Sequence, residues 1–202
     1  MSTAQRRSRV KSPRVAFTCP ACQTQFDAAD RCPNCQFTGS DTMRMFAGAP
    51  PEITTVNDQA DLFDSAALKT IERSRKRLAK RFPQFRWRLC TANLPAETNL
   101  RLYGFWMLNV APIRPDESES DRQWTVLLLI NAAANRAAVV PGYAAEPWLG
   151  NGQWDKALAR MVPAWKLEDF GKAVAEYYDV VRSMLENSWR HAAAVLTNEK
   201  QR

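Results

Sequence analysis

Four cysteines near the amino terminus are the residues of this sequence best suited to chemistry. They form two C-x2-C pairs, Cys19-Pro-Ala-Cys22 and Cys32-Pro-Asn-Cys35, separated by nine residues. Each pair presents two sulfurs on one side of a tight turn, and four thiolates can close a tetrahedron around zinc. Because the protein would fill all four positions, the spacing predicts a structural zinc site at Cys19, Cys22, Cys32 and Cys35.

Other chemistries for these thiols stay open. Iron can take the same ligand set, and either pair could form a disulfide or a redox couple, although two matched pairs favour a metal. Residues 17–37 resemble a short zinc ribbon of the kind found at the ends of many bacterial proteins. Gln23 and Gln36 stand where such ribbons usually have glycine with positive φ. The fifth cysteine, Cys90, lies in a predicted strand and is expected in the core.

The chain that must position this site divides by composition. Its first 16 residues hold five cations and no acid, while Gly48 and Pro50-Pro51 fall in a stretch without helical periodicity. We expect a basic disordered tail at 1–16, the zinc ribbon at 17–40, a linker at 41–52, a larger domain at 53–190 and a carboxy-terminal tail at 191–202.

The larger domain alternates helical and strand patterns. Asp64 is placed to cap a helix that ends before Pro83, and Trp124–Ile130 is a continuous apolar run typical of a central strand. Helices are predicted at 64–82, 97–109, 154–161 and 170–185, and strands at 85–92, 124–130 and 137–140. This order predicts an α/β fold, a three-layer α/β/α sandwich with three or more strands, preceded by the small four-cysteine zinc ribbon.

Several motifs in residues 53–190 resemble the TPM-domain family, which is found in thylakoid-lumen and bacterial proteins and is often described as phosphatase-like. Val56-Asn57-Asp58-Gln59-Ala60 is similar to the family's V-x-D-x-A opening, and Pro141–Leu149 is similar to its G-x-G-x-E-x-x-L segment. Two positions depart from the pattern: Asp121-Arg122-Gln123 replaces an Asp-Asn-Gly-like turn, and Ala144 replaces the second glycine. The resemblance implies an α/β/α domain and a phosphatase-like activity.

Carboxylates at the expected loop ends offer a second kind of site. Asp58, Asp121 and Glu146 could converge on a hard divalent cation such as Ca²⁺ or Mg²⁺, which could polarise a phosphoryl group and activate water. Capping and solvation are the alternative roles for these side chains. The acidic run from Asp116 to Asp121 is expected to be a solvated loop.

The charge pattern bears on partners and location. The net charge is +7, and the block from Lys69 to Arg88 holds nine Lys or Arg against one acid, Glu72. Such a block could contact nucleic acid, although a solvated helix face is the simpler reading. No apolar stretch reaches the length of about 20 residues that a membrane span needs, and none follows the basic start as in a secretory signal. We expect a cytoplasmic protein without membrane insertion.

Three functions follow from these features. The first is a binding or adaptor module with a protein partner, because the strongest site is structural. The second is a divalent-cation-dependent phosphatase, and the third is nucleic-acid binding. His191 is the only histidine, and no P-loop or G-x-G-x-x-G motif occurs, so no catalytic residues can be assigned and the question of enzymatic activity stays open.

Overall fold

A computed structural model describes residues 17–26, 30–112 and 114–200. Its centre is a four-stranded sheet in the order β3-β4-β5-β6. The first three strands are parallel, and the last is antiparallel to its neighbour. The strands are β3 (Val56–Asp58), β4 (Arg86–Ala92), β5 (Thr125–Asn131) and β6 (Arg136–Pro141).

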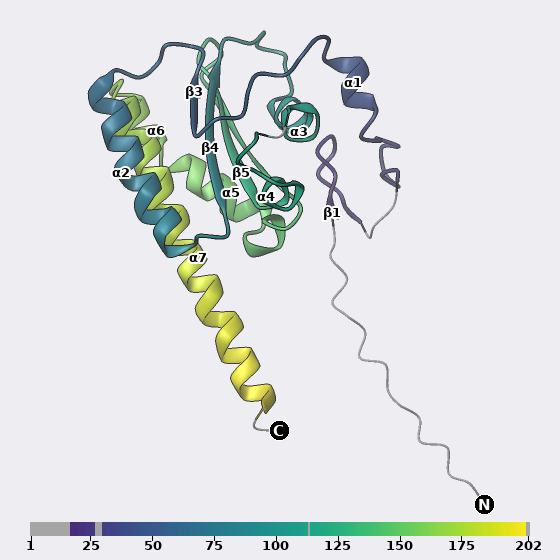
Figure 1. Ribbon diagram of the computed structural model, residues 1–202, viewed down its shortest axis with the longest axis vertical. Helices are drawn as coiled ribbons and strands as arrows, with labels where there is room; N and C mark the ends of the chain where they lie inside the picture. Colours follow the sequence, from purple (N-terminus) through teal and green to yellow (C-terminus); the bar gives the residue numbers. More distant parts are fainter. Residues whose placement is uncertain (1–16, 27–29, 113, 201–202) are drawn as a thin grey trace, which may run out of the picture.

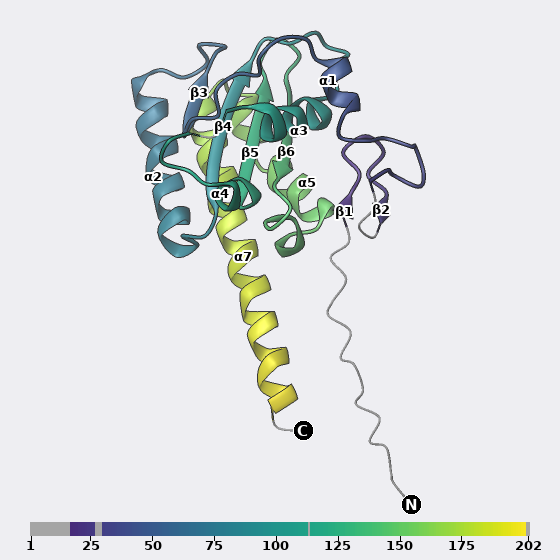
Figure 2. The same cartoon turned by 45° about the vertical axis from the view of Figure 1, so that its right-hand side comes forward.

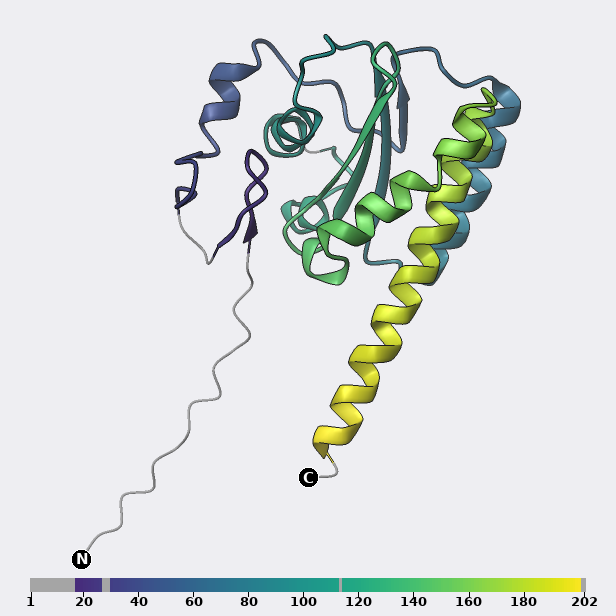
Figure 3. The same cartoon turned by 180° about the vertical axis from the view of Figure 1, so that it is seen from behind.

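Helices cover both faces of this sheet and confirm the predicted three-layer α/β/α arrangement (Figure 1). One face is covered by α2 (Ser65–Arg81), α5 (Asn151–Ala159), α6 (Val162–Trp165) and α7 (Phe170–Lys200). The other face carries α1 (Asp41–Met45) and α3 (Leu100–Val110). Short elements complete the chain: the pair β1 (Phe17–Thr18) and β2 (Gln25–Phe26), α4 (Glu119–Gln123) and the 3-10 helix η1 (Glu146–Trp148). From behind, α5 and α7 lie across the sheet from α3 (Figure 3).

The core follows from the alternation of side chains along the strands. Trp87 and Leu89 of β4 face the layer of α2 and α7, while Cys90 faces α3, as expected for a core cysteine. All seven residues of β5 are buried, which explains its unbroken apolar run. A strand buried on both faces needs a helix layer on each side, so the sheet dictates the three layers.

The two parallel crossovers differ in hand. The connection from β3 to β4 through α2 and the connection from β4 to β5 through α3 both move the chain in the same direction across the sheet. Because α2 and α3 lie on opposite faces, the two connections have opposite hands, and one is the rare left-handed form. One of these two connections is therefore of a kind that is uncommon between parallel strands.

Helices α2 and α7 run parallel and in contact. The Asp64 side chain accepts the Ala67 N–H at 2.7 Å and caps α2, as the sequence predicted. Further along, Arg77 pairs with Asp179 at 3.1 Å. At the start of the pair the backbones approach so closely that a Cβ on Gly171 would lie 2.6 Å from Ala67 Cα. Glycine is thus required where the helices first meet.

The structure differs from the expectations in several segments. Residues 41–52, expected as a linker, contain α1, and Phe46 packs on Tyr103 and Trp106 at ring distances of 5.2 and 5.4 Å. Residues 191–200, expected as a tail, continue α7, which projects beyond the sheet in every view. The short β3, α4 and α6 were not predicted, because each has too few residues to show a period. The basic tail at 1–16 lies outside the described residues.

The helices also bear on membrane insertion. None of the helices in the described ranges, including the 31-residue α7, is long and apolar enough to cross a membrane.

Replacing Gly171 by Ala should destabilise the protein by about 1–3 kcal/mol, because the new methyl group meets backbone that cannot move aside. Gly152 in α5 is the matched control, since a Cβ there meets nothing within 4 Å. Gly152→Ala should be neutral or stabilising by up to about 1 kcal/mol. Chemical denaturation of both variants measures the difference, and equal stabilities would contradict the close approach of α2 and α7.

Candidate metal centre

The four predicted cysteine ligands come together in the fold. Cys19 Sγ lies 3.7 Å from Cys35 Sγ, and Cys22 Sγ lies 3.7 Å from Cys32 Sγ. All four sulfurs lie within 4.8 Å of one another. A tetrahedral ion with bonds of about 2.3 Å to sulfur requires sulfurs about 3.8 Å apart. The donor set and its spacing therefore fit a metal ion such as zinc.

The two cysteine turns have the same backbone design. The N–H of Gln23 donates to the Cys19 carbonyl at 2.8 Å, and the N–H of Gln36 donates to the Cys32 carbonyl at 2.9 Å. Both glutamines adopt positive φ, 62° and 63°. They take the conformation that glycine usually supplies in such ribbons, so the turns form despite the substitution. This left-handed backbone costs roughly 1–2 kcal/mol per residue, which metal binding must offset.

The thiols differ in electrostatic environment. Hydrogen bonding to the Thr24 hydroxyl, with Asn34 beside it, lowers the pKa of Cys22 to about 5. Burial raises the pKa of Cys19 to about 12. Thr24 and Asn34 were not singled out from the sequence, because polar residues between cysteines carry no distinctive pattern. A metal ion is needed to hold Cys19 as a thiolate at neutral pH.

The segment that carries the cysteines, residues 17–37 (the four-cysteine segment), is docked against the larger domain (Figure 2). The Phe17 ring meets Tyr143 edge-on at 5.2 Å, and Phe37 meets Phe105 edge-on at 5.9 Å. These aromatic residues immediately flank the two cysteine pairs, and that placement is the sequence signal that could have predicted the docking.

Glu146 belongs to this docking contact. Its Oε1 accepts the backbone N–H of Thr18 at 2.9 Å, directly before Cys19. Burial raises the pKa of Glu146, because its charge is partly removed from water. This residue was expected as a ligand of a divalent cation, yet in the structure it holds the backbone that leads into the cysteine turns.

Asp58 organises a turn at the end of β3. Its carboxylate accepts the backbone N–H groups of Leu62 and Phe63 at 3.1 and 2.9 Å, and it also accepts the Thr91 hydroxyl. Thr91 lies opposite Asp58 in the parallel register of β3 and β4. The carboxylate therefore joins two strands to the turn that leads into α2.

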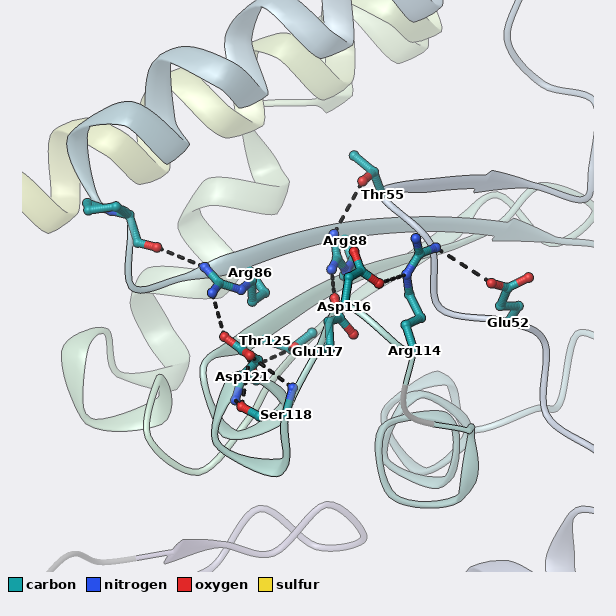
Figure 4. A network of polar contacts seen from close by, with 11 residues as sticks. Glu52, Thr55, Arg86, Arg88, Arg114, Asp116, Glu117, Ser118, Asp121 and Thr125 are labelled. Carbon is teal, nitrogen blue, oxygen red and sulfur yellow. Dashed lines mark hydrogen bonds and ion pairs between the residues drawn. The ribbon is translucent and has the colours of Figure 1, made fainter.

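The acidic loop before β5 is solvated only in part: Asp116 and Glu119 are exposed, as expected, but Glu117 and Asp121 are partly buried. Glu117 forms an ion pair with Arg88 of β4, and their side chains are only 16% and 11% exposed. Asp121 pairs with Arg86, and the backbone and side chain of Ser118 lower the pKa of Asp121. Figure 4 shows Glu117 and Asp121 of this loop paired with the two arginines of β4. Breaking such a buried pair would leave one unpaired charge.

Asp58, Asp121 and Glu146 do not form one site. Asp58 contacts Thr91 near the end of β4, whereas Asp121 contacts Arg86 at its start. Those backbone positions are about 16 Å apart along the strand. Across residues 17–26, 30–112 and 114–200, the only metal-sized group of three or more Cys, His, Asp or Glu side chains is the four cysteines.

The basic block is largely engaged in ion pairs within the domain. Arg75 and Lys76 pair with Glu72, Arg77 pairs with Asp179, and Arg81 pairs with Glu186. Two of these acids lie on α7, so the block helps to join α2 to α7.

Glu146 can be tested as a docking residue. Glu146→Gln keeps an oxygen that accepts the Thr18 N–H, so the hydrogen-exchange protection of the Thr18 amide should persist. In Glu146→Ala the free energy of protection of that amide should fall by about 1 kcal/mol, because the acceptor is lost. Because the folded pKa of Glu146 is raised, the protection it gives in the unmodified protein is full below the usual carboxyl pKa. It should fall as pH rises through the raised value. Loss of protection in Glu146→Gln would refute this role.

The chain is similar to a family of known proteins and to solved structures. One solved structure similar in fold is the solution NMR structure of the N-terminal domain of a protein from P. gingivalis, with a TM-score of 0.48 and 20% identity, covering 66% of this chain and 83% of that one. No curated protein matches the chain. The family model described as the TPM domain matches residues 56–184, which is more than half of the 202 residues. The chain therefore belongs to the TPM-domain family.

Proposed function

We propose that this protein is a binding module in which a TPM domain, braced by a zinc-loaded four-cysteine segment, holds a protein partner. The observation that carries the proposal is that the chain's best-formed site is closed. Four sulfurs occupy all positions around a tetrahedral ion, which leaves none for a substrate. Such a site stabilises a surface and does not perform a reaction.

Zinc suits the donor set better than the other candidates. A tetrahedral all-sulfur site accommodates zinc or iron, and zinc adds no redox chemistry that the surroundings would have to control. Metal binding also supplies folding energy to a segment in which few residues besides Cys19 and Cys32 are buried.

A phosphatase is the weaker candidate. A divalent-cation mechanism needs several carboxylates around one ion. Here Asp58 is engaged by two backbone N–H groups and a hydroxyl, Asp121 by Arg86 and Ser118, and Glu146 by Thr18. Each carboxylate has a structural partner in a different part of the fold.

Nucleic-acid binding is also weaker than protein binding. Six of the nine cations of the basic block form ion pairs with acids of the same domain. Contact with phosphates would have to compete with those pairs.

Phosphate release from an aryl phosphate decides between the binding and enzymatic roles. The zinc-loaded protein, with Ca²⁺ or Mg²⁺ added, should release phosphate no faster than its Asp58→Asn variant, because the carboxylates are not assembled. Circular dichroism of Asp58→Asn establishes that the variant is folded. Cation-dependent turnover that Asp58→Asn abolishes would replace the binding proposal with the phosphatase.

A further inference from the structure

A cavity of about 690 Å³ lies beside the turn between β5 and β6, away from the four-cysteine segment. Its volume falls within the range of about 300–1,000 Å³ that is typical of ligand sites. The lining comes from the β5–β6 turn and from α5, α6 and the start of α7. Apolar side chains form most of the wall: Leu158, Met161, Val162, Trp165 and Phe170.

The wall is held in a fixed arrangement. Trp165 donates its indole N–H to Asn135 Oδ1 at 3.3 Å and meets Phe170 edge-on at 4.7 Å. Asn135 and Glu168, both in the lining, adopt positive φ of 51° and 58°. Outside the two cysteine turns, only Asp61 shares this conformation among the non-glycine residues described. Unfavourable backbone of this kind tends to occur at ligand-binding positions.

The cavity adjoins the open edge of the sheet. The Gly142 N–H donates to the Thr125 carbonyl at 2.7 Å, so these two residues, which lie opposite each other in the antiparallel register, form a hydrogen-bonded pair. Hydrogen-bonded and non-hydrogen-bonded pairs alternate along an antiparallel ladder, and Ala137 and Val139 belong to the non-hydrogen-bonded pairs. Their backbone N–H and C=O groups therefore point away from β5. Ala137 also lines the cavity. A backbone donor and acceptor thus lie beside an apolar hollow.

A side-chain clasp covers the edge further along. Arg101 of α3 and Asp155 of α5 lie on opposite faces of the sheet and form an ion pair at 2.9 Å. Side chains from opposite faces can meet only around the edge strand, so this pair crosses β6. The clasp protects part of the edge from unspecific pairing. Ala137 is left at the end that opens to the cavity.

Apolar surface continues past the rim of the cavity. Val162 is 46% exposed and Leu167, between two lining residues, is 79% exposed. A small molecule inside the hollow would leave Leu167 uncovered, whereas a chain that crosses the rim would cover it. The combination of open backbone groups and an apolar hollow is the recognition pattern of peptides that add to a sheet edge.

We propose that this edge binds an extended peptide segment of the protein partner, which pairs with the backbone of Ala137 and inserts one apolar or aromatic side chain between Met161, Trp165 and Phe170. The proposal rests on the proposed binding function and assigns that function a surface. Backbone pairing supplies affinity, and the cavity selects the inserted side chain.

The test begins with a phage-display library of random peptides about twelve residues long, from which binders to the whole, zinc-loaded chain are selected. Peptides with a shared apolar or aromatic position should be enriched. Their affinity, measured by fluorescence anisotropy, should fall at least about tenfold in Val162→Asp and in Leu167→Asp. Met43→Asp is the matched control, because Met43 is 64% exposed on α1, and it should leave affinity unchanged.

A second measurement tests the backbone pairing without changing the protein. Methylation of single peptide nitrogens should weaken binding at one or two positions next to the shared apolar residue, where an N–H donates to the Ala137 carbonyl. Three results would overturn the proposal: no enrichment, binding unaffected by both Asp variants, or indifference to methylation at every position. Peptides that bind elsewhere would overturn the assignment of binding to this surface but not the proposed binding function. Cation-dependent phosphate turnover would overturn the binding function itself.

Discussion

The need to cover both faces of a fully buried strand organises this molecule. β5 has no exposed residue, so each face of the sheet requires its own layer. Four helices cover one face, but the other has a single long helix, α3. The remaining surface around α3 is completed by α1, by the acidic loop paired with Arg86 and Arg88, and by the four-cysteine segment. The four-cysteine segment, with its candidate metal centre, is therefore part of the layer that covers this face of the sheet.

This arrangement explains why the family's acidic positions hold structure in this chain. Glu146 accepts the N–H that precedes the first cysteine, and Asp58 fixes the turn into α2. Asp121 belongs to the loop that pairs with the arginines of β4. Because each carboxylate is satisfied by a different neighbour, we look for the function on the surface of the TPM domain, and the edge of β6 with its cavity is the surface that we propose for a peptide.

Much of this architecture could be predicted from the sequence. Strong periodicity predicted α2 with its Asp64 cap, and the C-x2-C spacing predicted the four sulfurs that converge. The pairing of Arg88 with Glu117 could not be predicted. A run of acidic residues has the same sequence pattern whether it lies in solvent or packs against a strand that is distant in the sequence. The role of Glu146 could not be predicted either, because its partner Thr18 lies 128 residues away and donates its backbone N–H. Long-range contacts that use backbone atoms leave no pattern in side-chain types.

Hydrogen exchange of the whole chain, measured with zinc added and again after treatment with a metal chelator, tests the central claim most directly. We expect metal loss to remove protection from the four-cysteine segment and also to increase exchange around Phe105 and Tyr143, which the segment contacts. The amides of β4 and β5 should remain protected, because their core does not include the metal. Unchanged exchange around Phe105 and Tyr143 would show that the four-cysteine segment is a separate unit and would contradict the account.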